Sequence, residues 1–196
     1  MPAGFVRAAA AARRRDLARA PPRLVAWRAM AELHVVLVEP EIHWNTGNAG
    51  RTCLAAGAQL HLVQPLGFSL EDAQVRRAGL DYWPRVSPRV WPNWSELERA
   101  LPALGAPFFF SSAGARDYQA VSYPRPAVLI FGRESVGLPP ELLARHRERT
   151  VRVPMLDPEL RSLNLSTAVG LGLYEARRQW NVAAASSSSP TSRRPA

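Results

Sequence analysis

Three segments of this chain carry polar side chains that suit chemistry on phosphate and hydroxyl groups. The first, EPEIHWNTGNAGRT, places Arg51 about one turn into a predicted helix whose N-terminus would attract phosphate. The second, AVLIFGRESVGLPPELL, has Glu134 just after a buried strand that ends at Gly132. The third, VRVPMLDPELRSLNLSTAVGLGLYEARRQW, offers Ser162 or Asn164 as a helix cap. A guanidinium among such groups can bind phosphate and stabilise a developing oxyanion.

Each segment, taken alone, is also compatible with a purely structural role. Asn45 and Thr46 suit the start of a helix, and Gly47 permits a tight turn before an exposed arginine. An ordinary strand-to-helix turn with a solvated Arg133–Glu134 pair would explain the second segment, and a buried apolar helix the third. The segments therefore indicate a site only in combination.

The chain offers no candidate metal site or disulfide. Its four histidines, His34, His43, His61 and His146, are scattered, and its single cysteine, Cys53, lies in an apolar stretch that predicts burial. The absence of a GxGxxG motif after a strand argues against a dinucleotide crevice. No apolar run approaches the roughly 18 residues of a membrane span, so an integral membrane protein is not expected. The expected location is the cytoplasm.

The elements that must position these segments alternate between short apolar strands and helices. Strands are predicted at 33–38, 59–65, 108–112, 127–132 and 151–154. Helices are predicted at 46–57, 71–79 and 163–180, with another after Pro139. This alternation predicts an α/β fold with a mainly parallel sheet flanked by helices. Ligands of such sheets bind beyond the carboxyl ends of the strands, which is where the polar segments begin.

Two glycines stand inside the last predicted helix. Gly170 and Gly172 each cost about 1 kcal/mol of helix stability relative to alanine. Close packing against another helix or a ligand would compensate for this loss. We therefore expect a close contact on this helix.

The net charge of +9 is concentrated at the two ends of the chain. Every basic residue is an arginine; residues 1–30 hold seven of them and one acid, and residues 183–196 hold two. The 16 arginines between them face 15 acids, so the charge gives only weak support for a nucleic-acid partner. Composition predicts that residues 1–30 are a disordered extension, a stretch before a misassigned start at Met30, or a transit peptide. Residues 31–182 would form one domain and residues 183–196 a flexible tail.

The three segments, in this order and spacing, resemble the motifs of the SPOUT methyltransferases. They are most similar to the TrmL-type tRNA (cytidine/uridine wobble-position) 2′-O-methyltransferases, and the resemblance covers residues 33–179. LVQPLGFSLEDAQVRRAGLDYW also resembles the stretch that follows the first motif in that family. Two departures occur: His-Trp at 43–44 replaces the usual Pro-Pro, and Ser-Val at 135–136 stands where Thr-Arg is usual.

The resemblance implies transfer of a methyl group from S-adenosylmethionine to a ribose 2′-hydroxyl, without a metal. The substrate would be the wobble nucleotide of tRNA, a cytidine or modified uridine, bound through the anticodon stem-loop. The fold would contain a C-terminal deep trefoil knot, and the protein would be a homodimer. The alternatives are a 2′-O-methyltransferase acting on another tRNA or rRNA position, and a non-catalytic knotted dimer that binds RNA or the cofactor.

The resemblance also assigns roles to individual positions. Arg51 matches the residue assigned as general base, but a protonated guanidinium has no acceptor, so phosphate binding and oxyanion stabilisation suit it better. The other implied catalytic residues are Asn45, Glu134, Asn164 and Tyr174, although a tyrosine on an apolar helix also fits the core. The implied cofactor contacts are Phe110, Gly132, Val153, Met155, Ser162 and Leu163. Arg76 and Arg77 would contact RNA phosphates, which position RNA without reading its sequence.

Overall fold

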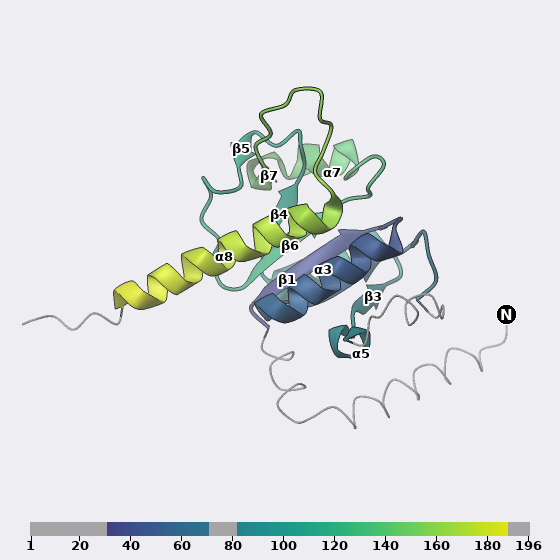
Figure 1. The fold of residues 1–196 in the computed structure, drawn as a ribbon, viewed down its shortest axis with the longest axis horizontal. Coiled ribbons are helices and arrows are strands. Elements are labelled where there is room, and N and C mark those ends of the chain that lie inside the picture. The colour runs from purple at the N-terminus through teal and green to yellow at the C-terminus, as the bar shows by residue number, and fades with distance from the viewer. Residues whose placement is uncertain (1–30, 71–81, 188–196) are drawn as a thin grey trace, which may run out of the picture. The chain divides into compact units, whose positions relative to one another are not determined.

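The computed structural model describes residues 31–70 and 82–187 of the chain. From Glu32 onward they belong to one unit of the chain (Figure 1). Its elements, in chain order, are β1 (Leu33–Val38), α3 (His43–Ala56), β2 (Gln59–Val63), α5 (Trp83–Val86), β3 (Arg89–Trp91), α6 (Trp94–Leu104), β4 (Ala106–Phe110), β5 (Arg116–Asp117), β6 (Ala127–Phe131), α7 (Pro140–Arg145), the 3-10 helix η1 (Arg147–Arg149), β7 (Thr150–Arg152) and α8 (Leu165–Ser187).

The strands form one sheet in the order β3-β2-β1-β6-β4-β7-β5. Every pairing between these strands is parallel, which confirms the predicted α/β class. The central strands β1 and β6 are buried along their whole length, as strands covered on both faces must be. Phe110 pairs with Phe131, and Leu37 pairs with the same residue from the other side, so three strands end together at one edge.

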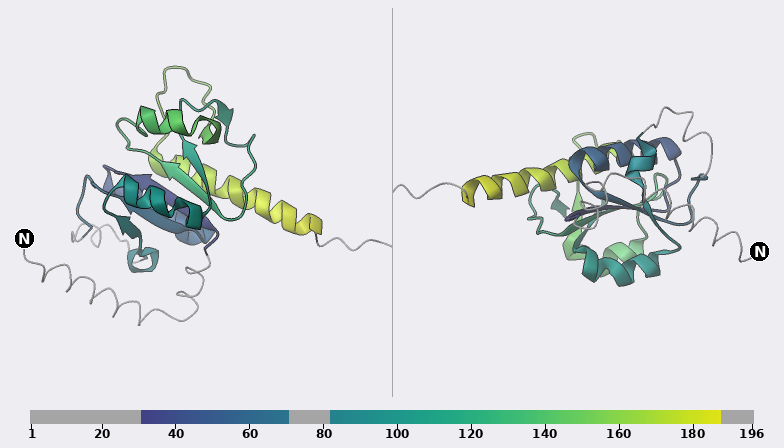
Figure 2. Two further views of the ribbon diagram at one scale, coloured as in Figure 1. Left: turned by 180° about the vertical axis from the view of Figure 1, so that it is seen from behind. Right: turned by 90° about the horizontal axis from the view of Figure 1, so that it is seen from below.

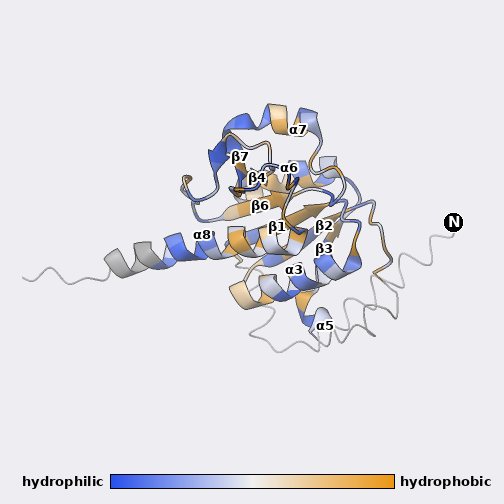
Figure 3. Ribbon diagram, turned by 45° about the horizontal axis from the view of Figure 1, so that its top comes forward, coloured by the Kyte–Doolittle hydropathy of each residue, from blue (hydrophilic) through white to orange (hydrophobic). Residues whose placement is uncertain are grey.

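Helices cover both faces of the sheet. α3 and α8 lie on one face and α6 and α7 on the other, as the right-hand view of Figure 2 shows. Each face has its own apolar core; one contains Leu37 and Leu129, and the other contains Val36 and Phe109. Figure 3 shows mainly hydrophobic residues along the central strands and mixed colouring along the covering helices. None of the helices in the described part of the chain is long and apolar enough to cross a membrane.

α3 and α8 are joined by side-chain contacts as well as by packing. Arg177 of α8 donates from Nε to the Ala56 carbonyl (2.7 Å) and from Nη2 to the Gly57 carbonyl (2.9 Å). These carbonyls belong to the end of α3, where Gly57 takes the left-handed conformation (φ 63°). A cation at this end of a helix satisfies free carbonyls and complements the helix dipole. The contact fixes α8 along α3.

The glycines of α8 face different surroundings: one of them is closely packed, as expected, but against a strand and not against another helix or a ligand. A Cβ added to Gly172 would lie 2.7 Å from Cζ of Phe110, whereas one added to Gly170 would meet only Thr52 Cγ2, at 4.0 Å. Gly172 thus lets α8 approach the end of β4. Gly170 has room for a methyl group beside α3.

Alanine substitutions at these two glycines are expected to change stability in opposite directions. Gly170→Ala gains helix propensity without a clash and should raise the free energy of unfolding by about 0.5–1 kcal/mol. Gly172→Ala pushes against the Phe110 ring and should lower it by about 1–3 kcal/mol. Urea unfolding of the two variants beside the parent protein measures both. Equal effects at the two sites would contradict this account of the packing.

The predicted elements are mostly confirmed, with several corrected boundaries. β4 spans Ala106–Phe110 where 108–112 was predicted, β7 spans Thr150–Arg152 where 151–154 was predicted, and β2 ends at Val63, two residues before its predicted end. The first helix begins at His43, not at Thr46, so Asn45, Thr46 and Gly47 are buried inside it and neither cap it nor form a turn. The reason is that the Asn45 side chain bonds to residues of two other loops. The last helix starts at Leu165, and its alanine-rich end continues to Ser187, past the predicted limits. The predicted helix at 71–79 lies outside the described residues.

Several short elements were not predicted. β3 and β5 have three and two residues, too few for a periodic pattern. α6 does carry a usable signal, because Asn93 accepts a hydrogen bond from the Glu96 amide (2.9 Å) and so caps the helix. These elements lie at the edges of the sheet or cover it.

Two of the histidines that look scattered in the sequence meet on the neighbouring strands β1 and β2. The indole N–H of Trp91 donates to Nδ1 of His61 (3.0 Å), which leaves the His61 proton on Nε2, 3.0 Å from Nδ1 of His34. His61 is only 1% exposed. Burial, then the nearby His34 and Arg89, lower the pKa of His61 from 6.5 to about 3. The fold therefore holds this ring neutral.

This neutral histidine predicts a loss of stability in acid. The unfolded chain takes up a proton near pH 6.5, and the folded protein does so only near pH 3, so unfolding binds a proton between these values. The free energy of unfolding is therefore unaffected by this group above pH 6.5. It falls by a few kcal/mol as the pH drops from 6.5 toward 3. Urea unfolding across this range measures it, with His61→Gln as the control that should flatten the slope. A slope unchanged in that variant would refute the assignment.

Candidate active site

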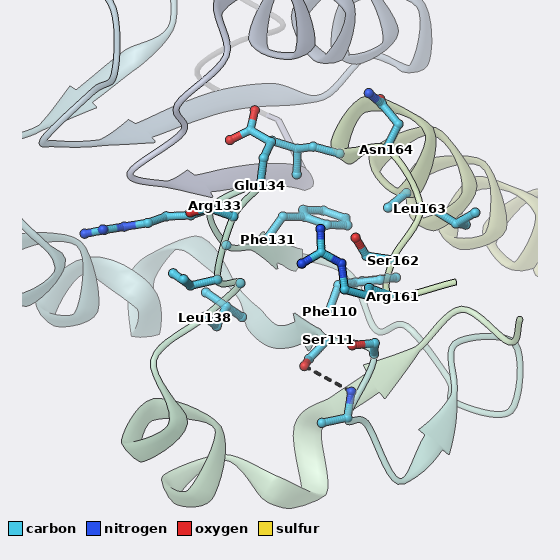
Figure 4. A pocket seen from close by; sticks show the side chains of 18 of the residues that line it. Phe110, Ser111, Phe131, Arg133, Glu134, Leu138, Arg161, Ser162, Leu163 and Asn164 are labelled. Atoms are coloured by element: carbon cyan, nitrogen blue, oxygen red, sulfur yellow. Dashed lines mark hydrogen bonds between the residues drawn. The ribbon is translucent and has the colours of Figure 1, made fainter. Parts of the chain in front are cut away.

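A cavity of about 680 Å³ opens where the central strands end. The loops after β4, β6 and β7 and the turn into α8 surround it, together with the first turn of α3 (Figure 4). Its volume lies within the range of small-molecule sites. Its position beyond the carboxyl ends of parallel strands is the one expected for a ligand in this class of fold.

Three side chains from the three polar segments form one hydrogen-bonded chain at the cavity. Asn45 donates from Nδ2 to Oε1 of Glu134 (3.0 Å) and accepts from Nδ2 of Asn164 (2.8 Å). The side-chain oxygen of Asn164 accepts from the Ser166 amide (2.9 Å), so this residue also caps α8. Residues up to 119 positions apart are thereby held in one arrangement.

The loops that carry these hydrogen-bonded side chains also form hydrogen bonds to each other. Glu134 accepts hydrogen bonds from the backbone amides of Glu41 (2.8 Å) and Ile42 (3.3 Å). In return, the carboxylate of Glu41 accepts from the amide (2.9 Å) and hydroxyl (2.8 Å) of Ser135. Arg133 forms an ion pair with Glu39, so the solvated Arg133–Glu134 pair considered from the sequence is wrong. The carboxylates thus hold the wall of the cavity in place.

The inner part of the cavity is apolar. The rings of Phe110 and Phe131 stack with centroids 4.5 Å apart, and Leu138, Val153 and Leu163 are among the other apolar residues of the lining. Phe110 occupies this place because the glycine at position 172 leaves room behind it. Such a surface suits a flat aromatic group, with the surrounding loop backbones available for directed hydrogen bonds.

The loop after β6 is folded back tightly on itself. The Arg133 amide donates to the Gly137 carbonyl (3.2 Å), and the Gly137 amide donates to the Arg133 carbonyl (2.9 Å). Gly137 has a φ of 73°, which favours glycine. A Cβ at Gly132 would overlap the backbone of Gly137 and Leu138. Close approach of the backbone therefore requires glycine at position 132, and the left-handed φ favours glycine at position 137.

Most of the residues selected from the sequence meet at this cavity. The lining includes all six expected cofactor contacts and three of the expected catalytic residues: Phe110, Gly132, Val153, Met155, Ser162, Leu163, Asn45, Glu134 and Asn164. Arg51 and Tyr174 are not part of the lining. The Arg51 guanidinium lies on the exposed side of α3, 4.5 Å from the centre of the Tyr82 ring, and Tyr174 is 54% exposed on α8. Arg76 and Arg77 lie outside the described residues.

Sequence reasoning missed a basic residue of the site. Arg161 lines the cavity, and Figure 4 shows its side chain directed into it. Ser111 and Ser112 add hydroxyl groups from the loop after β4. Arg161 could have been selected from the sequence, because it directly precedes Ser162 in the third segment. It adds a cation that can bind a carboxylate or a phosphate.

The described residues contain no group of three or more side chains that could hold a metal ion. Cys53 is buried, as predicted, and burial raises the pKa of its thiol. A buried neutral thiol is a poor nucleophile. The cavity thus presents amide, carboxylate, hydroxyl and guanidinium groups beside an apolar slot.

Comparison with known proteins agrees with this arrangement. Residues 32–174 match the model of the SpoU rRNA Methylase family. The chain is 47% identical to the tRNA (cytidine(34)-2′-O)-methyltransferase of Acidovorax sp. (strain JS42), over 74% of this chain and 91% of that protein.

Two solved structures are similar in fold and sequence. One, from work on 2-OH methylation of C/U34 on tRNA, is 45% identical with a TM-score of 0.71, covering 76% of this chain and 97% of the other. An AdoMet-bound rRNA methyltransferase from Sinorhizobium meliloti is 32% identical with a TM-score of 0.64, covering 75% of this chain and 56% of the other. With a family model matched over most of its length, the chain belongs to the SpoU methylase family.

Proposed function

We propose that this protein methylates the ribose 2′-hydroxyl of the wobble nucleotide of tRNA, a cytidine or modified uridine, with S-adenosylmethionine as the methyl donor. The observation that carries the proposal is the hydrogen-bonded chain of Glu134, Asn45 and Asn164, which unites three distant segments at one cavity. The names of the similar proteins from Acidovorax and from the tRNA C/U34 study support the choice of substrate.

The cavity fits the proposed cofactor. Phe110, Leu138 and Val153 offer an apolar slot for an adenine ring, and Arg161 and the serine hydroxyls offer partners for a carboxylate and a ribose. Three further lining residues complete the proposed contacts: Met155, Ser162 and Leu163. When bound, the cofactor supplies a methyl group on a sulfonium centre, which is already activated without a metal.

The protein's own contribution is mainly alignment. Asn45, Glu134 and Asn164 hold one another, so their polar groups can orient the ribose without rearranging. Alignment of this kind contributes up to about 7–11 kcal/mol in the best cases. Arg51 lies outside the cavity lining and is available to bind the adjacent phosphate and to stabilise charge on the 2′-oxygen. Tyr174 is proposed to act at the same site from its exposed position on α8.

We also propose a deep trefoil knot in the C-terminal part of the chain. Its support is the resemblance of the three segments to the SPOUT motifs together with the match to the SpoU family model. In the structure, α8 contacts the segment before β6. Gln179 donates to the Val121 carbonyl (2.9 Å) and accepts from the Tyr123 amide (3.1 Å), and the Trp180 indole donates to the Tyr123 carbonyl (2.8 Å). A homodimer and a cytoplasmic location complete the proposal. The long helix α8 is the candidate element for the contact between subunits.

Methyl transfer to defined RNAs tests the proposed function. The purified full chain is incubated with unmodified tRNA and isotopically labelled S-adenosylmethionine, and the digested nucleosides are mapped by mass spectrometry. We expect label on the 2′-oxygen of the wobble nucleotide. Label at another tRNA position, or in ribosomal RNA only, would refute the substrate; cofactor binding without any transfer would refute catalysis.

RNA binding is expected to weaken with salt along a shallow slope. The part of the chain between the two arginine-rich ends is nearly neutral, so only a few arginines can replace counterions on the phosphates. A plot of log affinity against log salt should have a slope magnitude of about 2–4. Replacing Arg76 and Arg77 with alanine should reduce that magnitude by up to about two. Fluorescence anisotropy with labelled tRNA measures this, and a salt-independent affinity would contradict it.

A further inference from the structure

An exposed aromatic side chain lies, in the sequence, between two residues that line the cavity. Trp44, in the first turn of α3, is 53% exposed. Two residues close to it in the sequence, Ile42 and Asn45, both line the cavity. The His43 ring lies against Trp44 with centroids 4.7 Å apart, and Phe68 lies 6.4 Å from His43. The indole is therefore supported from one side while much of it remains open to solvent.

Trp44 begins a stripe of exposed residues along α3. Asn48 and Arg51 follow it at spacings of four and seven residues, which places all three on one face of the helix. The stripe is about 10 Å long at 1.5 Å per residue. α3 contains no acidic residue. This face therefore carries no negative side chain. Its aromatic ring can stack on a base, its amide can hydrogen-bond to the polar edge of a base, and its guanidinium can bind a phosphate.

We propose that Trp44 stacks on an unpaired base of the RNA next to the methylated ribose, with Arg51 on a neighbouring phosphate. This inference rests on the proposed function and adds a residue that positions the substrate. A second copy of the chain suits this surface less well, because homodimer interfaces are more apolar than the rest of the surface, whereas two polar residues, Asn48 and Arg51, follow Trp44 along this face. Stacking on a base tolerates such polar neighbours.

Binding of two RNA probes to Trp44 variants tests the inference. The probes are a short hairpin with an anticodon-type loop and a blunt duplex of the same stem, and the variants are Trp44→Leu and Trp44→Phe. We expect Trp44→Leu to weaken hairpin binding by about tenfold or more, since stacking is lost. Trp44→Phe keeps a ring and should stay within about threefold. Duplex binding should be nearly unchanged in both.

Two further measurements separate stacking from a structural role. Calorimetry with S-adenosylhomocysteine should give the same affinity in both variants and the parent, and size-exclusion chromatography should give the same elution volume. Equal hairpin affinity in the leucine variant and the parent would overturn the inference, as would equal losses in both variants, weakened cofactor binding, or a changed elution volume. Because the readout is binding, a parent protein that binds the hairpin without methylating it refutes only the proposed function.

Discussion

Replacing Arg51 with alanine is expected to lower the rate of methyl transfer by about 10²–10³-fold. The guanidinium lies on the exposed face of α3 against Tyr82, outside the cavity lining, so the cofactor pocket should keep its shape without it. The loss should therefore appear in turnover and in RNA binding. Single-turnover kinetics with saturating cofactor and unmodified tRNA measure it, beside calorimetry with S-adenosylhomocysteine.

Arg147 provides a matched control for this variant. It is an exposed arginine in η1 and is not part of the cavity lining. Arg147→Ala removes the same charge and should change the rate less than about threefold. Arg51→Lys keeps a positive charge but loses the planar fork, and an intermediate rate is expected. Full activity of Arg51→Ala would remove this residue from the mechanism, and loss of cofactor binding would show a structural role instead.

The fold could be predicted from the sequence wherever the apolar pattern is strong. β6 is a continuous apolar run and β1 is apolar except for one histidine, and the burial of both strands follows from that pattern. The predicted start of α3 is three residues too late because Asn45 has the side chain of a helix cap, while its real partners lie 89 and 119 residues away. Local propensity contains no information about such distant partners.

The site could be predicted in outline because its residues come in recognisable segments. The direct contact between Asn45 and Asn164 could not, since it depends on how α8 packs against α3. The same is true of the contact between Phe110 and Gly172, where one missing side chain makes room for another. The sequence indicates that both glycines of α8 are costly, but only the three-dimensional packing distinguishes Gly172 from Gly170.

The substitution Gly132→Ala is expected to have the largest effect on the cavity. Its Cβ would overlap backbone atoms of Gly137 and Leu138, and backbone cannot move aside as a flexible side chain can. The turn after β6 would have to open, which should lower the free energy of unfolding by about 3 kcal/mol or more. Since Glu134 lies within this turn, its bond to Asn45 should be lost as well. Cofactor binding should then fall below detection in calorimetry with S-adenosylhomocysteine.

Gly137→Ala separates the overlap from the effect of simply losing a glycine. Gly137 has a left-handed φ of 73° but open space where a Cβ would lie, so an alanine there meets strain without a clash. The expected cost is about 1–2 kcal/mol, with the turn still closed and cofactor binding retained. Urea unfolding should therefore rank Gly132→Ala well below Gly137→Ala in stability. The reverse ranking would mean that backbone strain, and not the contact between the two arms of the turn, shapes this wall of the cavity.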